Sequence, residues 1–141
     1  MEFLKEVPGK WDPDRFYCVK EQVYYLPEPF AGAKKERLKG IRCLRTGLLL
    51  GEVQKGRFEP SQALAMAWKK EEYPYRLTLS LDDERCIRYL KGETLTLTEE
   101  EAAAAKKGKW YLICVEDYPL GWGKIQNQSL KNKYYPGWRW Q

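Results

Sequence analysis

The stretch KWYLICVE, residues 109–116, gives the strongest indication of secondary structure in the chain. It contains the longest uninterrupted apolar run, Trp110–Val115, which would place apolar side chains on both faces of an extended strand. Such a strand is typical of the middle of a sheet that is covered on both sides. The run is far shorter than the roughly 20 residues that a membrane-spanning helix requires. We therefore expect a central β-strand in a folded domain and no membrane partner.

Further short strands are predicted on both sides of this segment. Tyr75–Leu81 alternates between apolar and polar residues, with Leu77 and Leu79 on the apolar face, which is typical of a half-buried strand. After a turn at Asp117–Pro119, a glycine-interrupted strand is expected over Leu120–Gln126. The shorter strand candidates are Phe16–Val19, Val23–Leu26, Ile41–Arg45, Leu48–Val53 and Thr94–Leu97.

Short helices are predicted between the strands. Pro60–Lys70 has proline at a first-turn position, and Thr98–Ala105 begins with a capping box. A helix within Ser80–Gly92 ends at the glycine, and a helical turn is expected at Lys34–Lys39. The inward-facing residues of the Ser80–Gly92 helix would be Cys86, Ile87 and Leu90. The pattern indicates an α+β fold around a small mixed sheet or partly open barrel, with an N-terminal lobe (residues 1–70) and a C-terminal lobe (residues 71–141).

The composition argues against catalysis. The chain has no histidine, which removes Cys/His zinc sites and Ser-His or Cys-His nucleophile pairs. Its four cysteines lack C-x-x-C spacing, so we expect buried free thiols; with no visible signal peptide, they favour a cytoplasmic protein. An enzyme using Asp82, Asp83, Glu116 or Asp117 is a further possibility, but these residues are typical of helix starts and turns. We predict no catalytic residues, no metal and no cofactor.

The net charge of +5 is unevenly distributed along the chain. Residues 34–57 contain eight basic and two acidic side chains, and residues 118–141 contain four basic side chains and no acidic one. The intervening stretch, residues 71–117, has an acidic excess. The two basic segments could meet on one face after folding, and such a face would attract phosphate groups. The alternative is that these lysines and arginines are ordinary solvated surface residues.

The C-terminal segment, residues 118–139, combines cations, aromatic rings and glycines in a pattern that favours RNA. Glycines on both sides of Trp122 would let backbone N–H groups approach a phosphate closely. Rings such as Trp138 offer flat faces for an unstacked base, although Trp122 could instead be a core residue on a bulged strand. The predicted RNA-binding residues are Gly121, Trp122, Gly123, Lys124, Lys131, Asn132, Lys133, Tyr134, Tyr135 and Arg139, together with Lys55 and Arg57 from the first basic segment.

Three motifs in this order carry a resemblance to a known family: GEVQKGRFEPSQALA at 51–65, RYLKGETL at 88–95, and YPLGWGK at 118–124 with LKN at 130–132 and YPG at 135–137. They resemble the C-terminal PUA-like region of the RsmF-type Nol/Nop/Sun rRNA cytosine methyltransferases, over roughly residues 15–139. The resemblance implies a PUA-like β pseudo-barrel with helices and ribosomal RNA as the ligand. It would place Gly121, Gly123, Lys124, Lys131, Asn132 and Tyr135 on the RNA-facing motif. Lys55, Arg57 and Ser61 fall on the upstream motif, where Ser61 could cap a helix.

The resemblance does not extend to that family's catalytic features. Those enzymes use one cysteine after proline and one after threonine, whereas the cysteines here follow Tyr17, Arg42, Arg85 and Ile113. We therefore interpret the chain as a free-standing, non-catalytic RNA-binding protein that contacts structured rRNA and acts as an accessory factor in ribosome biogenesis or rRNA modification. Its partners would include ribosomal particles or an rRNA methyltransferase. Two alternatives stay open: an adaptor that supplies a methyltransferase with RNA binding, anchored by Trp138 and Trp140, or the C-terminal fragment of an rRNA cytosine methyltransferase.

Overall fold

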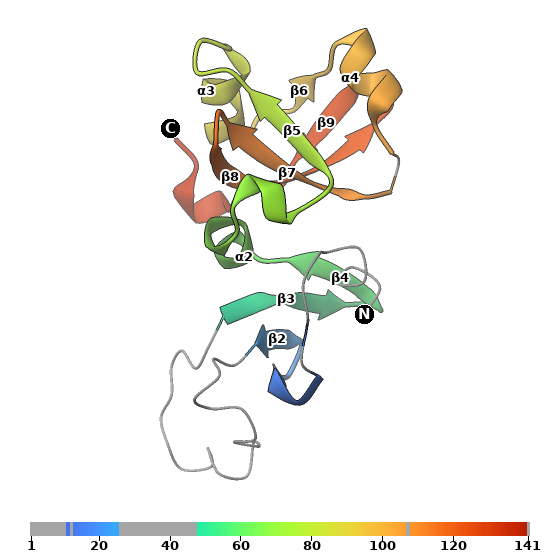
Figure 1. Ribbon diagram of the computed structural model, residues 1–141, viewed down its shortest axis with the longest axis vertical. Helices are drawn as coiled ribbons and strands as arrows, with labels where there is room; N and C mark the ends of the chain where they lie inside the picture. Colours follow the sequence, from blue (N-terminus) through green and yellow to red (C-terminus); the bar gives the residue numbers. More distant parts are fainter. Residues whose placement is uncertain (1–10, 12, 26–47, 107, 141) are drawn as a thin grey trace. The chain divides into compact units, whose positions relative to one another are not determined.

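The computed structural model describes residues 11, 13–25, 48–106 and 108–140 (Figure 1). The chain divides into two compact units, Met1–Leu64 and Ala65–Gln141, and each is described by itself. The division falls a few residues before the one expected from the sequence. The predicted helical turn at Lys34–Lys39 and the predicted strand at Ile41–Arg45 lie outside the described residues.

The first unit contains a four-stranded antiparallel sheet. Its strands follow the sequence order, β1 (Phe16–Val19), β2 (Gln22–Tyr25), β3 (Leu48–Gln54) and β4 (Arg57–Pro60), preceded by the short 3₁₀ turn η1 (Pro13–Arg15). Val23 and Leu50 are buried in this sheet. The sequence did not predict β4, because its proline was assigned to a helix start.

Pro60 is in fact the last residue of β4, and the helix that follows it, α2 (Gln62–Ala67), begins two residues later. Ser61 lies between the two elements. Its Oγ accepts a hydrogen bond from the backbone N–H of Leu64 at 3.0 Å and donates to the carbonyl of Leu49. Ser61 therefore caps α2 and ties it to β3, as the sequence suggested for this residue.

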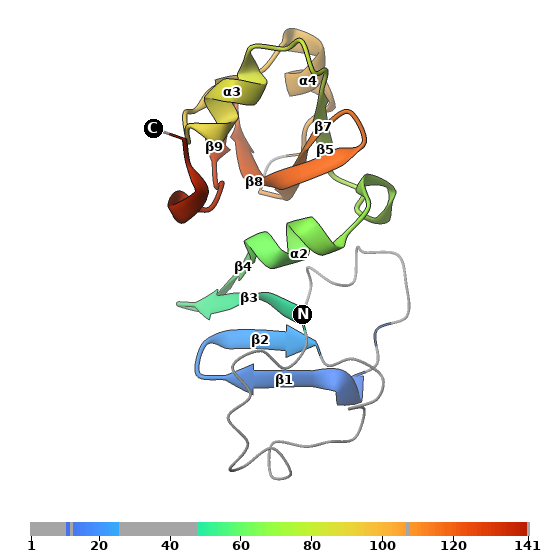
Figure 2. The ribbon, with the colours of Figure 1, turned by 90° about the vertical axis from the view of Figure 1, so that its left-hand side faces the viewer.

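The second unit is a five-stranded sheet curled into a half-barrel (Figure 2). Its strand order is β5 (Arg76–Leu79), β7 (Trp110–Val115), β8 (Tyr118–Gln126), β9 (Ser129–Asn132) and β6 (Leu95–Thr96). β5 and β7 are parallel, whereas the other neighbours are antiparallel. The predicted central strand is confirmed, because β7 has a hydrogen-bonded neighbour on each side. β9 was not predicted, since it has only one large apolar residue, Leu130.

The concave face of this sheet holds the main core of the unit. Two helices, α3 (Arg85–Leu90) and α4 (Glu99–Ala104), lie at one end of the half-barrel (Figures 1 and 2). The predicted capping box at Thr98 is confirmed. The expected inward position of Ile87 is wrong: Ile87 is 53% exposed, and Tyr89 is buried in its place. The core residues are Leu77, Leu79, Cys86, Tyr89, Leu95, Leu97, Tyr111, Ile113, Ile125, Leu130 and Tyr134.

The convex face carries a smaller aromatic cluster. Trp122 of β8 packs edge-on against Tyr73 and Trp68, with ring centroids 5.1 Å and 6.1 Å away. Trp68 follows α2, and Tyr73 follows the 3₁₀ turn η3 (Lys70–Glu72). The Tyr73 hydroxyl donates to the carbonyl of Trp110 at 2.7 Å, which fixes this cluster against β7.

The cysteines within the described residues are free thiols. Cys86 and Cys114 are buried as expected, and burial raises the pKa of the Cys114 thiol to about 11. Cys18 is exposed, so the expectation of burial is wrong at that position. Among the described residues, no helix is long and apolar enough to cross a membrane.

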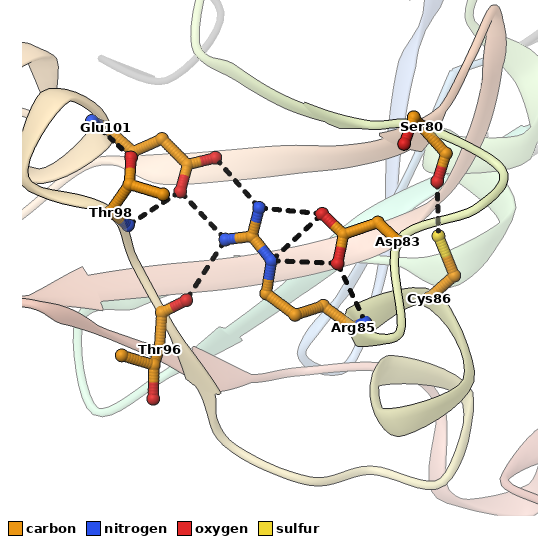
Figure 3. A network of polar contacts seen from close by, with 7 residues as sticks. All are labelled: Ser80, Asp83, Arg85, Cys86, Thr96, Thr98 and Glu101. Carbon is orange, nitrogen blue, oxygen red and sulfur yellow. Dashed lines mark hydrogen bonds and ion pairs between the residues drawn. The ribbon is translucent and has the colours of Figure 1, made fainter.

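Arg85 holds the helical end of the half-barrel together (Figure 3). Its guanidinium contacts Asp83 with Nη2 at 2.8 Å and Glu101 with Nη1 at 2.8 Å, and Nη1 also donates to the carbonyl of Thr96 at 3.0 Å. The network thus joins the β5–α3 loop, the start of α3, β6 and α4. The hydrogen bonds from Arg85 hold the pKa values of Asp83 and Glu101 below their ordinary values.

Removal of this cation should weaken the fold at neutral pH. We expect Arg85→Met to lower the free energy of unfolding by about 1–3 kcal/mol, because two partly buried carboxylates and a carbonyl lose their partner. Both carboxyl groups have depressed pKa values in the folded state, so their contribution is present above their unfolded values near 4 and is lost as the pH falls through the folded values. The difference from wild type should therefore shrink in acid. Urea unfolding of the wild type and the variant at pH 7 and pH 3 measures this difference in the free energy of unfolding.

Arg88→Met is the matched control, since Arg88 is on the same helix and half-exposed, 3.9 Å from Glu93. An equal loss of stability in the two variants at pH 7 would contradict the role of Arg85. So would a difference from wild type that grows in acid.

Candidate nucleic-acid interface

Three lysines lie together on the convex side of the second sheet. Lys124 of β8 is directly opposite Trp110 of β7 on one side and Lys131 of β9 on the other. Opposed residues on antiparallel strands project from the same face, so these three side chains share it. Lys133, two residues beyond Lys131, follows on the same side, where its backbone N–H donates to the carbonyl of Trp122. We call Lys124, Lys131 and Lys133, with Trp110 beneath them, the lysine face.

The Trp110 ring positions two of these cations. The Nζ atom of Lys124 is 4.5 Å from the ring centroid, and the Nζ atom of Lys133 is 5.9 Å from it. Each such contact contributes about 0.5–1 kcal/mol at an exposed site. Lys131 is exposed to solvent. Ammonium groups held this close repel one another, and a polyanion that bridges them relieves the repulsion.

Sequence reasoning missed Trp110 as part of this face and gave it only the role of a strand residue. Trp110 is largely covered, with 9% of the residue exposed, and the ammonium groups of Lys124 and Lys133 lie over its ring. The contacts come from β7, β8 and the end of β9, so only the strand register brings them together. The sequence did contain a signal for this contact, namely the antiparallel hairpin of β7 and β8. Once its turn is assigned to residues 116–117, the strand register places Trp110 opposite Lys124.

Trp122 is not available for stacking on a base. Its side chain is 1% exposed and belongs to the aromatic cluster with Tyr73 and Trp68. Its backbone carbonyl accepts hydrogen bonds from the Tyr89 hydroxyl at 2.8 Å and from the backbone N–H of Lys133 at 3.1 Å. The structure therefore supports the core alternative for this residue, and Trp122 leaves the set of candidate RNA contacts.

Asn132 and Tyr134 are also core residues, each 8% exposed. The Asn132 Nδ2 donates to the carbonyls of Tyr89 at 2.8 Å and Glu93 at 2.9 Å. Its Oδ1 accepts from the backbone N–H of Tyr134 at 2.8 Å, so the amide has partners within the fold. The Tyr134 ring packs against the Tyr89 ring at 5.3 Å. A base edge therefore meets neither side chain in this structure.

The glycines of β8 serve packing rather than phosphate binding. Gly121 and Gly123 are both buried, and Gly123 is paired with Tyr111 on one side and Asn132 on the other. A Cβ atom at Gly123 would lie 2.9 Å from a methyl group of Leu130, so any larger residue would collide with the core. The backbone around these glycines, which we expected to bind a phosphate, instead pairs with the neighbouring strands β7 and β9.

The last candidates of this unit lie on the C-terminal segment, which ends in the 3₁₀ turn η4 (Pro136–Trp138). Tyr135 is 51% exposed, and its contact with RNA stays a prediction. Arg139 is half-buried: its Nε donates to the carbonyl of Tyr134 at 3.2 Å, and its stem lies over Gly92. Arg139 thus anchors the segment to the end of α3, and this role is structural.

Lys55 and Arg57 belong to the first unit. Lys55 and Gly56 form the two-residue turn between β3 and β4, with φ values of 50° and 77°. Both basic side chains are exposed at this hairpin tip. The predicted convergence of the two basic segments stays a prediction, since residues 34–47 lie outside the described part. No group of three or more potential metal-binding side chains is present among the described residues.

Family models match both parts of the chain. Residues 76–140 match the PUA domain of the methyltransferase RsmF, and the curled sheet with its short helices is the α+β architecture expected for it. The second unit is therefore a PUA-like domain, a class of RNA-binding domain. Residues 2–68 match the first C-terminal domain of the RsmF rRNA methyltransferase. The chain belongs to the RsmF rRNA methyltransferase family, of which it carries these two non-catalytic C-terminal domains.

Proposed function

We propose that this chain binds structured ribosomal RNA through the lysine face of its PUA-like domain and itself performs no methyl transfer. The observation that carries the proposal is the assembly of Lys124, Lys131 and Lys133 around Trp110 by three neighbouring strands. The segment from residue 118 to residue 141, which contains these lysines, has no acidic residue, so it supplies no carboxylate of its own to neutralise them. The family match supports RNA, and ribosomal RNA in particular, as the polyanion.

The role of the bound chain is to hold rRNA for a modification or assembly step carried out by another catalytic domain. Both matched regions are non-catalytic parts of a methyltransferase family. Such a chain would act as an accessory factor in ribosome biogenesis in the cytoplasm. Incorporation of label from a methyl donor into rRNA by this chain alone would contradict the non-catalytic assignment.

The affinity for an rRNA hairpin should fall steeply with salt. If the three lysines contact three phosphates, the slope of log affinity against log salt concentration should be about −2 to −3, because each phosphate contact releases roughly 0.7–0.9 counterions. Filter binding or fluorescence anisotropy from about 50 to 200 mM salt measures this slope. Heparin serves as a competitor that has charge but no bases.

Two results would contradict the proposal. One is the absence of rRNA binding at the lowest salt concentration. The other is an affinity that does not change with salt, which would mean that phosphate contacts do not drive association.

A further inference from the structure

Two large aromatic rings are exposed together on the C-terminal segment. Tyr135 is 51% exposed and Trp138 is 52% exposed. Their ring centroids are 5.9 Å apart, and their planes meet at 84°, in an edge-to-face arrangement. We call these two residues the C-terminal ring pair. Exposed aromatic groups that lie next to each other frequently mark a binding surface.

The fold holds this pair in place. The backbone N–H of Trp138 donates to the carbonyl of Tyr135 at 3.0 Å, which closes the turn η4. A Cβ atom at Gly137 would lie 2.7 Å from the Tyr135 ring, so the ring lies directly against the glycine backbone. Beneath the pair, the ring of buried Tyr134 is 6.5 Å from the Trp138 ring. Rings fixed in this way lose little conformational entropy when a ligand binds.

Two further contacts fasten the segment to the helical end of the domain. The Nε of Arg139 donates to the carbonyl of Tyr134 at 3.2 Å, and the backbone N–H of Trp140 donates to the carbonyl of Leu90 at 2.9 Å. Figure 2 shows the C-terminal end of the chain beside α3. The ring pair is thus held on both sides by contacts that involve neither ring.

The charge of the segment that carries the ring pair favours one class of ligand. Lys133 is two residues before Tyr135, and two residues of extended chain span at most about 7 Å. No acidic residue occurs between residue 118 and residue 141. A ligand that satisfies both features carries negative charge next to a flat ring, which describes a phosphate and an unstacked base of one nucleic-acid segment. An apolar protein surface would leave the cations without a counterpart.

We propose that the C-terminal ring pair stacks on an unpaired base, with Trp138 as the main platform, while the lysine face holds neighbouring phosphates. This inference rests on the proposed function and adds the class of RNA: structured RNA with a bulged or loop nucleotide, rather than uninterrupted duplex. Bases inside a duplex have both faces covered by their neighbours, so they cannot reach the rings.

The test compares two RNA hairpins at a single salt concentration. Both are closed by a flexible non-nucleotide linker in place of loop bases, and they differ by one bulged nucleotide, so only one of them has an unpaired base. The wild-type chain should bind the bulged hairpin about 5- to 100-fold more tightly, the range expected for one base–aromatic stack. Trp138→Ala and Trp138→Leu should both remove this preference and leave the affinity for the plain hairpin unchanged. Leucine keeps an apolar side chain over Tyr134 but has no flat face, so it separates stacking from packing. Trp138→Phe should retain part of the preference.

Tyr118→Ala is the matched control, because Tyr118 is 75% exposed in the same domain but lies at the start of β8. It should bind both hairpins like wild type.

Equal binding of the two hairpins by the wild-type chain, with normal salt dependence, would overturn the ring-pair proposal and leave the proposed function standing. Equal weakening of both hairpins by Trp138→Leu would also overturn it. A protein partner that is retained after nuclease treatment and high salt, and lost in Trp138→Leu, would assign the pair to a protein instead. Absence of binding to either hairpin would refute the proposed function itself.

Discussion

Replacement of Lys124, Lys131 and Lys133 together by glutamate is expected to lower the affinity for structured rRNA by about 100-fold or more near 0.1 M salt. Each lysine that contacts a phosphate contributes close to one unit to the salt dependence, so the slope of log affinity against log salt should become shallower by about 2 to 3. The glutamates also repel the phosphates that the lysines attracted. Anisotropy titrations over a range of salt concentrations measure both quantities in one series.

A control variant with the same change in net charge tests whether the loss of affinity depends on the position of these lysines. Lys20, Lys69 and Lys106 are exposed, and their joint replacement by glutamate changes the net charge by the same amount. That variant should lose much less affinity. Lys124 lies on the Trp110 ring, so its replacement could also disturb the local structure. Replacement of the same three lysines by glutamine, with circular dichroism as a check on folding, separates the loss of phosphate contacts from such a disturbance. Equal affinities for the two triple-glutamate variants would remove the lysine face from the interface.

Asn132→Asp is expected to destabilise the domain by about 3 kcal/mol or more, measured by urea unfolding at pH 7. The wild-type amide donates to the carbonyls of Tyr89 and Glu93 and accepts from the backbone N–H of Tyr134. An aspartate keeps the acceptor but has no donor when ionised, so a buried negative charge would face two carbonyl oxygens. These contacts join the end of α3 to the start of the C-terminal segment. We therefore expect the variant to weaken the packing of both the helix end and the segment.

Asn127→Asp provides the comparison. Asn127 is exposed in the turn between β8 and β9 with a φ of 55°, a conformation that aspartate tolerates, so its unfolding free energy should change by less than about 0.5 kcal/mol. If Asn132→Asp unfolded at the same urea concentration as this control, the amide would not be a structural link. Loss of RNA binding in Asn132→Asp alone would then indicate direct contact with RNA.

The sequence predicted those elements whose signal is local. Trp110–Val115 is apolar on both faces, and it is a central strand; Thr98 and Glu101 form the capping box that their spacing indicates. β4 and β9 were missed, because each is recruited by pairing with a stronger neighbour across a two-residue turn. Ile87 was assigned to the core because it is apolar, but the helix turns it about 100° away from buried Cys86. Tyr89, three residues after Cys86, lies on the buried side in its place.

The site was predicted less well than the fold, for a physical reason. Lys124, Lys131 and Lys133 were predicted as RNA-binding residues without the strand pairing that brings them together, and their contact with RNA stays a prediction. The structure places them on one face of the sheet, because residues on a strand alternate between its faces. The same alternation turns the side chain of Asn132 into the core. Its burial was not predicted, because a polar residue in the sequence is normally assigned to the surface. For Trp122 the sequence left two roles open, contact with RNA and a place in the core. The structure supports the core role, because Trp68 and Tyr73, which are distant in the sequence, pack against its ring.

The strand order of the PUA-like domain also has a consequence for its assembly. β7, β8 and β9 are consecutive and joined by short turns, whereas β5 and β6 precede them in the sequence and attach to opposite edges of the same sheet. A chain in which only the three consecutive strands have paired would therefore present two open edges at once. Open edges are templates for strands of other molecules, so during folding the risk of misassembly is highest before β5 and β6 join the sheet.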